Sequence, residues 1–235
     1  MVASLSARGV KTRHIQRMVT ALDRQLFARL FELVVPAEVA ADCCLVVMGS
    51  EGRGEQILKT DQDNLLLMRP GADRAAVAAA AGALSDGLER MGYPPCPGGY
   101  MVNNPRWQLT PDELKERIGE AGRQPEGQAL MDLAVLLDGS PVAGAMGLWE
   151  EARTEGARRL ANHPSLLSAF ARPILEFDTP LGAFAHLRTG AGARGDALDV
   201  KKGGIFPIVH GARSLALEAR RETTGTAERL HGAAA

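Results

Sequence analysis

Two short, uninterrupted apolar runs most constrain what this chain can fold into. Residues 43–48 read CCLVVM, and an acidic stretch, DQDN, leads into LLLM at residues 65–68. A short continuous apolar run bounded by turn-forming residues is typical of a strand that is buried on both faces. We therefore predict two buried strands, over residues 43–48 and 61–68, with the glycine-containing segment 49–60 between them.

Most of the remaining sequence shows helical spacing of its apolar residues. The segment that starts at Thr110 has the residues of a capping box, with Pro111 in the first turn and Glu113 three positions on. Residues 129–138 are expected to begin as a helix and to end as a third buried strand, with 139–144 as a turn. Helices are expected over 10–35, 72–91, 110–122, 145–161, 165–177 and 206–222.

This order of elements predicts an α+β fold. Residues 1–35 form an N-terminal helix, and residues 36–145 form a domain with a small mixed β-sheet flanked by helices. Residues 146–235 form a helical C-terminal domain, because only helices and loops are expected after about residue 145.

Composition limits the partners. The formal net charge of −1 argues against long nucleic acid as a ligand. No apolar run approaches the roughly 18 residues that a membrane span needs. Three cysteines without a secretory leader indicate reduced thiols in a cytoplasmic protein. Cys96 has no histidine close to it in the sequence, so we expect it to be structural rather than nucleophilic.

The polar residues around the two predicted strands suggest a site for phosphate and metal. Asp61 and Asp63 are two residues apart, so on a strand their carboxylates point to one face and can hold a hard divalent cation. Gly49 and Ser50 directly follow the first apolar run. Glycine lets the backbone approach a ligand closely, and the N–H groups of such a turn, with the serine hydroxyl, can cradle a triphosphate.

Two neighbouring side chains have alternative roles. Arg53 either contacts a phosphate or forms an ion pair with Glu51 or Glu55 in the same charged segment. Asn64 either braces the two carboxylates or caps a backbone group.

These motifs resemble a known family. Gly-Ser-x-x-Arg at residues 49–53, followed by Asp-x-Asp at 61–63, resembles the signature of the polymerase β-like nucleotidyltransferases. The fuller string GSEGRGEQ…TDQDN resembles, more narrowly, a bacterial family related to the N-terminal domain of the protein-PII uridylyltransferases. The resemblance covers nearly the whole chain, continuing through residues 96–107, 136–144, 198–218 and 224–230.

The resemblance implies an enzyme that moves a nucleoside monophosphate from a nucleoside triphosphate to an acceptor hydroxyl and releases pyrophosphate. It implies Mg²⁺, as two ions, or Mn²⁺, held by Asp61, Asp63 and a third carboxylate. Asp138 is the expected third ligand and also a candidate base, with Asp132, expected on a helix surface, as the runner-up.

The resemblance also implies a nucleotide cleft between two domains. Gly49, Ser50 and Arg53 would bind the triphosphate from one side. Lys201 and Lys202, next to Gly203-Gly204, would reach it from the other, unless they belong to a solvated loop.

Two departures from the family pattern bear on activity. The chain has Asp138-Gly139-Ser140-Pro141 where the family usually has Asp-x-Arg-Pro, so one phosphate or acceptor contact is missing. The chain also ends soon after residues 226–230, so the acceptor surface is expected to be incomplete or to be completed by another subunit.

Three interpretations follow. The acceptor is a protein, as in the uridylyltransferases; it is a small molecule or a nucleic acid 3′ end; or the chain is a nucleotide-sensing module without catalysis. The sequence leaves the nucleotide base and the oligomeric state open.

Overall fold

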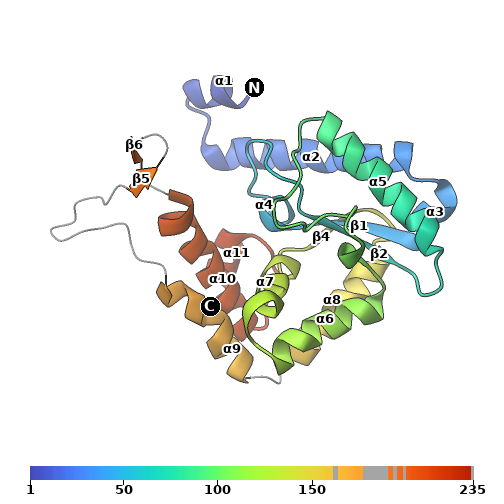
Figure 1. The fold of residues 1–235 in the computed structure, drawn as a ribbon. Helices are drawn as coiled ribbons and strands as arrows, with labels where there is room; N and C mark the ends of the chain where they lie inside the picture. Colours follow the sequence, from blue (N-terminus) through green and yellow to red (C-terminus); the bar gives the residue numbers. More distant parts are fainter. Residues whose placement is uncertain (161–163, 177–189, 193–194, 198–199, 234–235) are drawn as a thin grey trace.

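The computed structural model of the protein describes residues 1–160, 164–176, 190–192, 195–197 and 200–233. Its centre is a four-stranded mixed sheet in the order β3-β2-β1-β4, which confirms the predicted α+β class (Figure 1). Strand β1 is antiparallel to both β2 and β4, and β2 is parallel to the short β3. The strands are β1 (Cys43–Val47), β2 (Asn64–Met68), β3 (Gln108–Leu109) and β4 (Ser140–Gly144).

Helices cover both faces of the sheet, and the two central strands are apolar apart from Asn64. Every residue of β1 and β2 is buried. On one face Leu45 and Leu66 pack among side chains of α2, α3 and α5; on the other, Val46 and Leu65 pack among those of α6, α7 and α8 (Figure 1). These helices are α2 (Thr12–Val34), α3 (Ala37–Asp42), α5 (Arg74–Arg90), α6 (Pro111–Arg123), α7 (Gly127–Leu136) and α8 (Gly147–Leu160).

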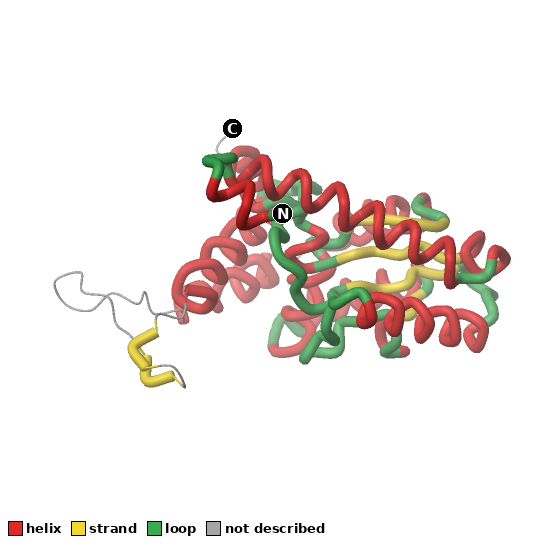
Figure 2. Tube along the Cα trace, turned by 90° about the horizontal axis from the view of Figure 1, so that it is seen from above, coloured by secondary structure: helices red, strands yellow, loops and turns green. Residues whose placement is uncertain are grey.

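The last helices lie to one side of the sheet rather than over its faces (Figures 1 and 2). Helix α10 packs against α11 and α9, and the rings of Phe170 and His210 are 4.6 Å apart at one of these contacts. The elements are α9 (Pro164–Ala171), η2 (Arg172–Glu176), β5 (Gly190–Gly192), β6 (Gly195–Ala197), η4 (Lys201–Ile205), α10 (Phe206–Glu218) and α11 (Thr226–Ala233).

Short elements complete the order of the chain. They are α1 (Val2–Ala7), α4 (Gly49–Gly52) and η1 (Pro105–Trp107). The capping box predicted at Thr110 is present, with the Thr110 and Glu113 side chains each accepting a hydrogen bond from the other residue's backbone N–H. Within the described part of the chain, no helix combines the length and apolar character needed to cross a membrane.

Four local predictions were wrong. The part of the chain after about residue 145 does not contain only helices and loops, because residues 190–192 and 195–197 pair as the antiparallel strands β5 and β6. Residues 129–138 do not end as a strand: helix α7 runs to Leu136, and the strand is the following segment 140–144, which was predicted to be a turn. A short apolar run does not by itself distinguish a buried helix from a strand. Pro141 is tolerated in β4 because β4 is an edge strand. The second strand begins at Asn64 rather than at Asp61, and residues 201–205 are helical rather than a glycine-rich loop.

Candidate functional site

The two aspartates of the DQDN stretch lie directly before β2, and their carboxylates are on the same side. The intervening residue, Gln62, is buried: its side chain donates to the carbonyl of Tyr93 over 3.1 Å. Asp61 and Asp63, on either side of it, are only half-buried, so their side chains are not enclosed with that of Gln62. One ligand atom from each of Asp61, Asp63 and Cys96 lies within 4.8 Å of the others.

Gly49 brings the end of β1 against this carboxylate pair. The backbone N–H of Met48 donates to the carbonyl of Asp63 over 2.7 Å, which continues the β1–β2 pairing by one step. Gly49 then adopts a φ of +55°, and a β-carbon there would stand 2.3 Å from Oδ2 of Asp63. Glycine therefore satisfies both the left-handed backbone and the close approach.

The four residues of α4 also pack closely against the sheet. A β-carbon at Gly52 would stand 2.1 Å from the backbone oxygen of Asp138 and 2.7 Å from that of Val47. The hydroxyl of Ser50 lies 3.5 Å from that of Thr60. These contacts fix the glycine segment between the carboxylate pair and the turn that contains Asp138.

The pKa of Asp63 is raised to about 6. Burial is the largest cause; a hydrogen bond from the Cys96 thiol lowers the pKa and the charge of Asp61 raises it further. Two neighbouring carboxylates, both half-buried, repel each other, and a cation between them would relieve that repulsion. The carboxylates thus fit a hard divalent ion, while the thiol is a softer donor than Mg²⁺ prefers.

Asp138 has different neighbours. It lies in the turn between α7 and β4, is fully buried, and accepts hydrogen bonds from three guanidinium groups. Its oxygens are 2.5 Å from Nη1 of Arg53, 3.0 Å from Nε of Arg213 and 2.8 Å from Nη1 of Arg229. Burial alone would raise the pKa of Asp138, but the hydrogen bond and charge of Arg213, with the charges of Arg53 and Arg229, hold it below its ordinary value.

The arginine-bound Asp138 links the C-terminal helices to the glycine segment. Arg213 comes from α10 and Arg229 from α11, while Arg53 follows α4. Arg53 also pairs with Glu55 over 2.7 Å, and Glu55 accepts a hydrogen bond from the backbone of Thr226 over 2.6 Å. Of the two roles predicted for Arg53, the ion pair with Glu55 is present. Asp138 lies outside the group formed by Asp61, Asp63 and Cys96, and its role as third metal ligand stays a prediction.

Asn64 takes the second of its two predicted roles, since its side-chain oxygen accepts a hydrogen bond from the backbone N–H of Val102 over 2.8 Å. Asp132 is not on a helix surface as predicted. It is buried on α7 and accepts hydrogen bonds from Arg106 over 2.5 Å and from Gln128 over 2.7 Å.

Ser140, at the position where the family pattern usually has arginine, is contacted by an arginine from elsewhere in the chain. Arg24 of α2 donates to the Ser140 hydroxyl over 2.9 Å and to the carbonyl of Pro141 over 2.7 Å. A guanidinium group from α2 is therefore present beside β4. Lys201 is exposed in η4, and the Lys202 side chain lies outside the described residues.

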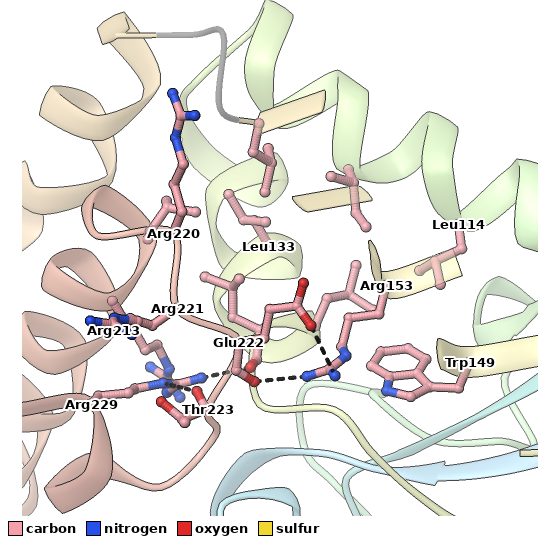
Figure 3. A pocket seen from close by; sticks show the side chains of 16 residues that line it. Leu114, Leu133, Trp149, Arg153, Arg213, Arg220, Arg221, Glu222, Thr223 and Arg229 are labelled. Atoms are coloured by element: carbon pink, nitrogen blue, oxygen red, sulfur yellow. Dashed lines mark hydrogen bonds and ion pairs between the residues drawn. The ribbon is translucent and has the colours of Figure 1, made fainter. Parts of the chain in front are cut away.

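A separate pocket opens between α6–α8 and the C-terminal helices (Figure 3). Its lining includes Trp149 and Arg153, together with Arg213 and Arg229 of the Asp138 cluster, but none of Gly49, Ser50, Asp61, Asp63 or Cys96. Two buried donors of this lining, Nε1 of Trp149 and Nε of Arg153, have no hydrogen-bond partner among the described residues. The pocket thus borders the arginine cluster without forming part of the carboxylate site.

Fold and site together define a nucleotidyltransferase-type protein, in which a small mixed sheet presents a glycine turn beside paired aspartates. Residues 1–128 match the family described as "Putative nucleotidyltransferase DUF294", and residues 164–235 match the "Putative nucleotidyltransferase substrate binding domain". The chain belongs to this nucleotidyltransferase family. A comparison with curated proteins found no match.

Cys96 is the site residue that sequence reasoning missed. It is 33 positions from Asp63 in the sequence, and no spacing rule relates the two. The composition of residues 93–107, rich in Pro, Gly and Asn, indicated only a loop.

Proposed function

We propose that this protein transfers a nucleoside monophosphate from a nucleoside triphosphate to an acceptor hydroxyl, with Mg²⁺ or Mn²⁺, and releases pyrophosphate. One observation carries the proposal: the backbone of Gly49 lies against the carboxylate of Asp63. A turn suited to phosphate and a pair of cation ligands therefore occupy one place. Separately, each of these features is common in proteins; together, in a nucleotidyltransferase family member, they support this reaction.

The residues of the turn would orient the triphosphate. The backbone N–H groups of the turn at Gly49 and Ser50 are suited to phosphate oxygens, because glycine lets the backbone come close to a ligand. The Ser50 hydroxyl adds a donor, and the adjoining Asp61 and Asp63 would hold the divalent cation. When bound, that cation neutralises phosphate charge and lowers the pKa of the acceptor hydroxyl.

In the transfer itself, the acceptor oxygen forms a bond to the α-phosphorus as the bond to the bridging oxygen breaks. Pyrophosphate leaves with the electron pair of that bond, and the proton of the hydroxyl passes to solvent. The contribution of the chain is to hold the triphosphate and the acceptor in line.

The acceptor that the family resemblance favours is a hydroxyl on a protein, as in the protein-PII uridylyltransferases. In this proposal residues 36–145 form the catalytic domain and residues 146–235 present the acceptor, and Lys201 and Lys202 reach the triphosphate from the second side. Asp138 would act as third ligand or base only if its arginine partners release it.

The test is pyrophosphate release by purified protein with each of the four nucleoside triphosphates and Mg²⁺ or Mn²⁺. Asp61→Asn and Asp63→Asn should abolish release, because each change removes the charge of a cation ligand. Asp86→Asn is the matched control, since Asp86 is exposed on α5. Intact-mass analysis of proteins captured by this chain, before and after incubation with nucleotide, would then identify a protein acceptor.

Two results would contradict this proposal. If the protein binds a nucleotide but releases no pyrophosphate with any acceptor fraction or metal, the transferase proposal is wrong and the nucleotide-sensing interpretation replaces it. If Asp61→Asn keeps wild-type release, the assignment of the carboxylate pair is wrong.

A further inference from the structure

We infer that Cys96 is a protein ligand of the cation held by Asp61 and Asp63, and that its sulfur makes this site select Mn²⁺ over Mg²⁺. The inference rests on the proposed function, since it concerns the same cation. It adds a ligand that is not a carboxylate and a preference among divalent ions.

The geometry supplies the first step. A sulfur or oxygen atom from each of the three residues lies within 4.8 Å of the other two, so one ion can contact all three. The thiol of Cys96 already donates a hydrogen bond to Asp63. All three residues are half-buried, so the group is open to an ion arriving from solvent.

The loop that contains Cys96 is tied to the strand on both sides of Asp63. The backbone N–H of Gln62 donates to the carbonyl of Pro94, and that of Asn64 donates to the carbonyl of Tyr100, each over 2.9 Å. The loop therefore forms an arch whose two ends are held by the residues before and after Asp63, with Cys96 between them.

The interior of the arch is also fixed. The carbonyl of Cys96 accepts a hydrogen bond from the backbone N–H of Gly99 over 2.9 Å. The backbone N–H of Cys96 donates to the sulfur of Met101 over 3.1 Å. The Asn64 side chain holds Val102 just beyond the arch. A ligand held by such supporting contacts is preorganised, whereas a thiol on a mobile loop would meet the carboxylates only by chance.

The chemistry of the donor atoms sets the preference. Mg²⁺ binds oxygen almost exclusively and demands near-ideal octahedral geometry. Mn²⁺ accepts carboxylates equally well, and divalent transition metals tolerate a thiolate that Mg²⁺ does not. When the ion binds, the thiol proton is released to solvent and the sulfur completes a set of two carboxylates and one thiolate.

Asp138, the alternative third ligand, is less available. Its two oxygens accept hydrogen bonds from Arg53, Arg213 and Arg229, and it would have to give up ion pairs in a fully buried position before contacting a cation. Cys96 needs no such rearrangement.

The first experiment reads the sulfur–metal bond without any activity assay. Metal-free protein is titrated with Co²⁺, and the near-ultraviolet charge-transfer band of a cobalt–thiolate bond is recorded. The band should appear in the wild type and be lost in Cys96→Ser and in Asp61→Asn. Cys43 and Cys44 remain in every variant and are buried, so they serve as an internal control. A band that persists in Cys96→Ser, or no band in the wild type, would overturn the inference.

The second experiment measures selectivity. The ratio of Mn²⁺ to Mg²⁺ affinity, from electron paramagnetic resonance of free Mn²⁺ with Mg²⁺ as competitor, should fall at least about tenfold in Cys96→Asp, or roughly 1.4 kcal/mol. Circular dichroism checks the fold of this variant. If Cys96→Asp does not fold, the same fall in the affinity ratio should appear in Cys96→Ser. An unchanged ratio in both folded variants contradicts the inference.

The two proposals fail in different ways. Pyrophosphate release in a protein that shows no cobalt–thiolate band would leave the transferase standing and remove Cys96 from the site. A cobalt band with the expected selectivity, in a protein that never releases pyrophosphate, would support the metal site and reject the transferase.

Discussion

Gly49 and Asp63 are in such close contact that a single methyl group at residue 49 would occupy the place of the Asp63 carboxylate. The added β-carbon would stand 2.3 Å from Oδ2 and 3.1 Å from Cγ of Asp63. Because the near atoms belong to the end of a side chain, the carboxylate would turn aside rather than the backbone. The glycine therefore controls where the cation ligand points, in addition to permitting the turn.

Gly49→Ala should accordingly lower affinity for Mn²⁺ at least about tenfold, roughly 1.4 kcal/mol, while the protein stays folded. The cost in stability should be about 1–2 kcal/mol, from the left-handed backbone. Isothermal titration with Mn²⁺ and denaturant unfolding measure the two effects. Gly71→Ala is the matched control: Gly71 has a φ of +86° but nothing within 4 Å of its added β-carbon. Gly71→Ala should lose similar stability and keep its affinity for Mn²⁺. If Gly49→Ala and Gly71→Ala bind Mn²⁺ equally tightly, the steric argument is contradicted.

Asp138→Asn should destabilise the protein by about 3–5 kcal/mol. The change removes the one carboxylate that Arg53, Arg213 and Arg229 share, and it leaves buried guanidinium charge uncompensated. Urea unfolding followed by circular dichroism measures the loss. Asp112→Asn is the control, because that side chain is 82% exposed in its pair with Lys115 and should contribute less than about 0.5 kcal/mol.

The same variant tests the role that the resemblance assigned to Asp138. A third metal ligand would give the opposite pattern, with stability retained and metal affinity lost. Normal stability in Asp138→Asn would therefore rule out its structural role as the shared partner of the three arginines.

The double variant Lys201→Ala with Lys202→Ala tests the second side of the proposed nucleotide cleft. Removal of two ammonium groups that contact phosphate should weaken nucleotide binding at least about tenfold, or roughly 1.4 kcal/mol. Lys115→Ala is a control on α6 that should leave binding unchanged. The measurement is fluorescence titration with a labelled nucleotide, and unchanged affinity in the double variant would return both lysines to a solvated role.

The sequence predicted the two central strands and the side-by-side placement of the two aspartates because both depend on neighbouring residues. The strands β1 and β2 are apolar apart from Asn64, helices cover both faces of the sheet, and that burial is visible as composition. The side-by-side placement of Asp61 and Asp63 was expected from their two-residue spacing, and their ligand atoms lie within 4.8 Å of each other. The capping box at Thr110 is likewise a local pattern.

What the sequence did not predict depends on contacts between distant segments. The Cys96 thiol reaches Asp63 only because backbone hydrogen bonds at Gln62 and Asn64 hold both ends of its loop. The surroundings of Asp138 include arginines 75 and 91 positions later, and arginines are usually exposed, so nothing local marked them as its partners. Helix α7 was misassigned at its end because its apolar run suits either a buried helix or a buried strand.

The buried carboxyl group of Glu51 should make the stability of the protein depend on pH. The side chain is 6% exposed, and neither carboxylate oxygen has a hydrogen-bond partner among the described residues. Burial, and to a lesser extent the charge of Asp23, raises the pKa of Glu51 to about 8, against a smaller lowering by Arg24. In the unfolded chain the pKa returns to its ordinary value of 4.5. Below that pH both states are protonated and Glu51 does not affect stability. As the pH rises toward 8, the unfolded state ionises first, so stability is lost.

Glu51→Gln should remove this loss, because the amide has the same shape and no charge. The variant should match the wild type near pH 4.5 and become more stable by about 2–3 kcal/mol near pH 7. Urea unfolding at a series of pH values measures the difference, with Glu89→Gln, exposed on α5, as the control. Because Glu51 lies two residues from Gly49, a gain in stability together with a loss of nucleotide affinity would show that the buried carboxyl group also shapes the turn. Parallel pH curves for wild type and Glu51→Gln would instead mean that Glu51 is solvated and the segment around it is open.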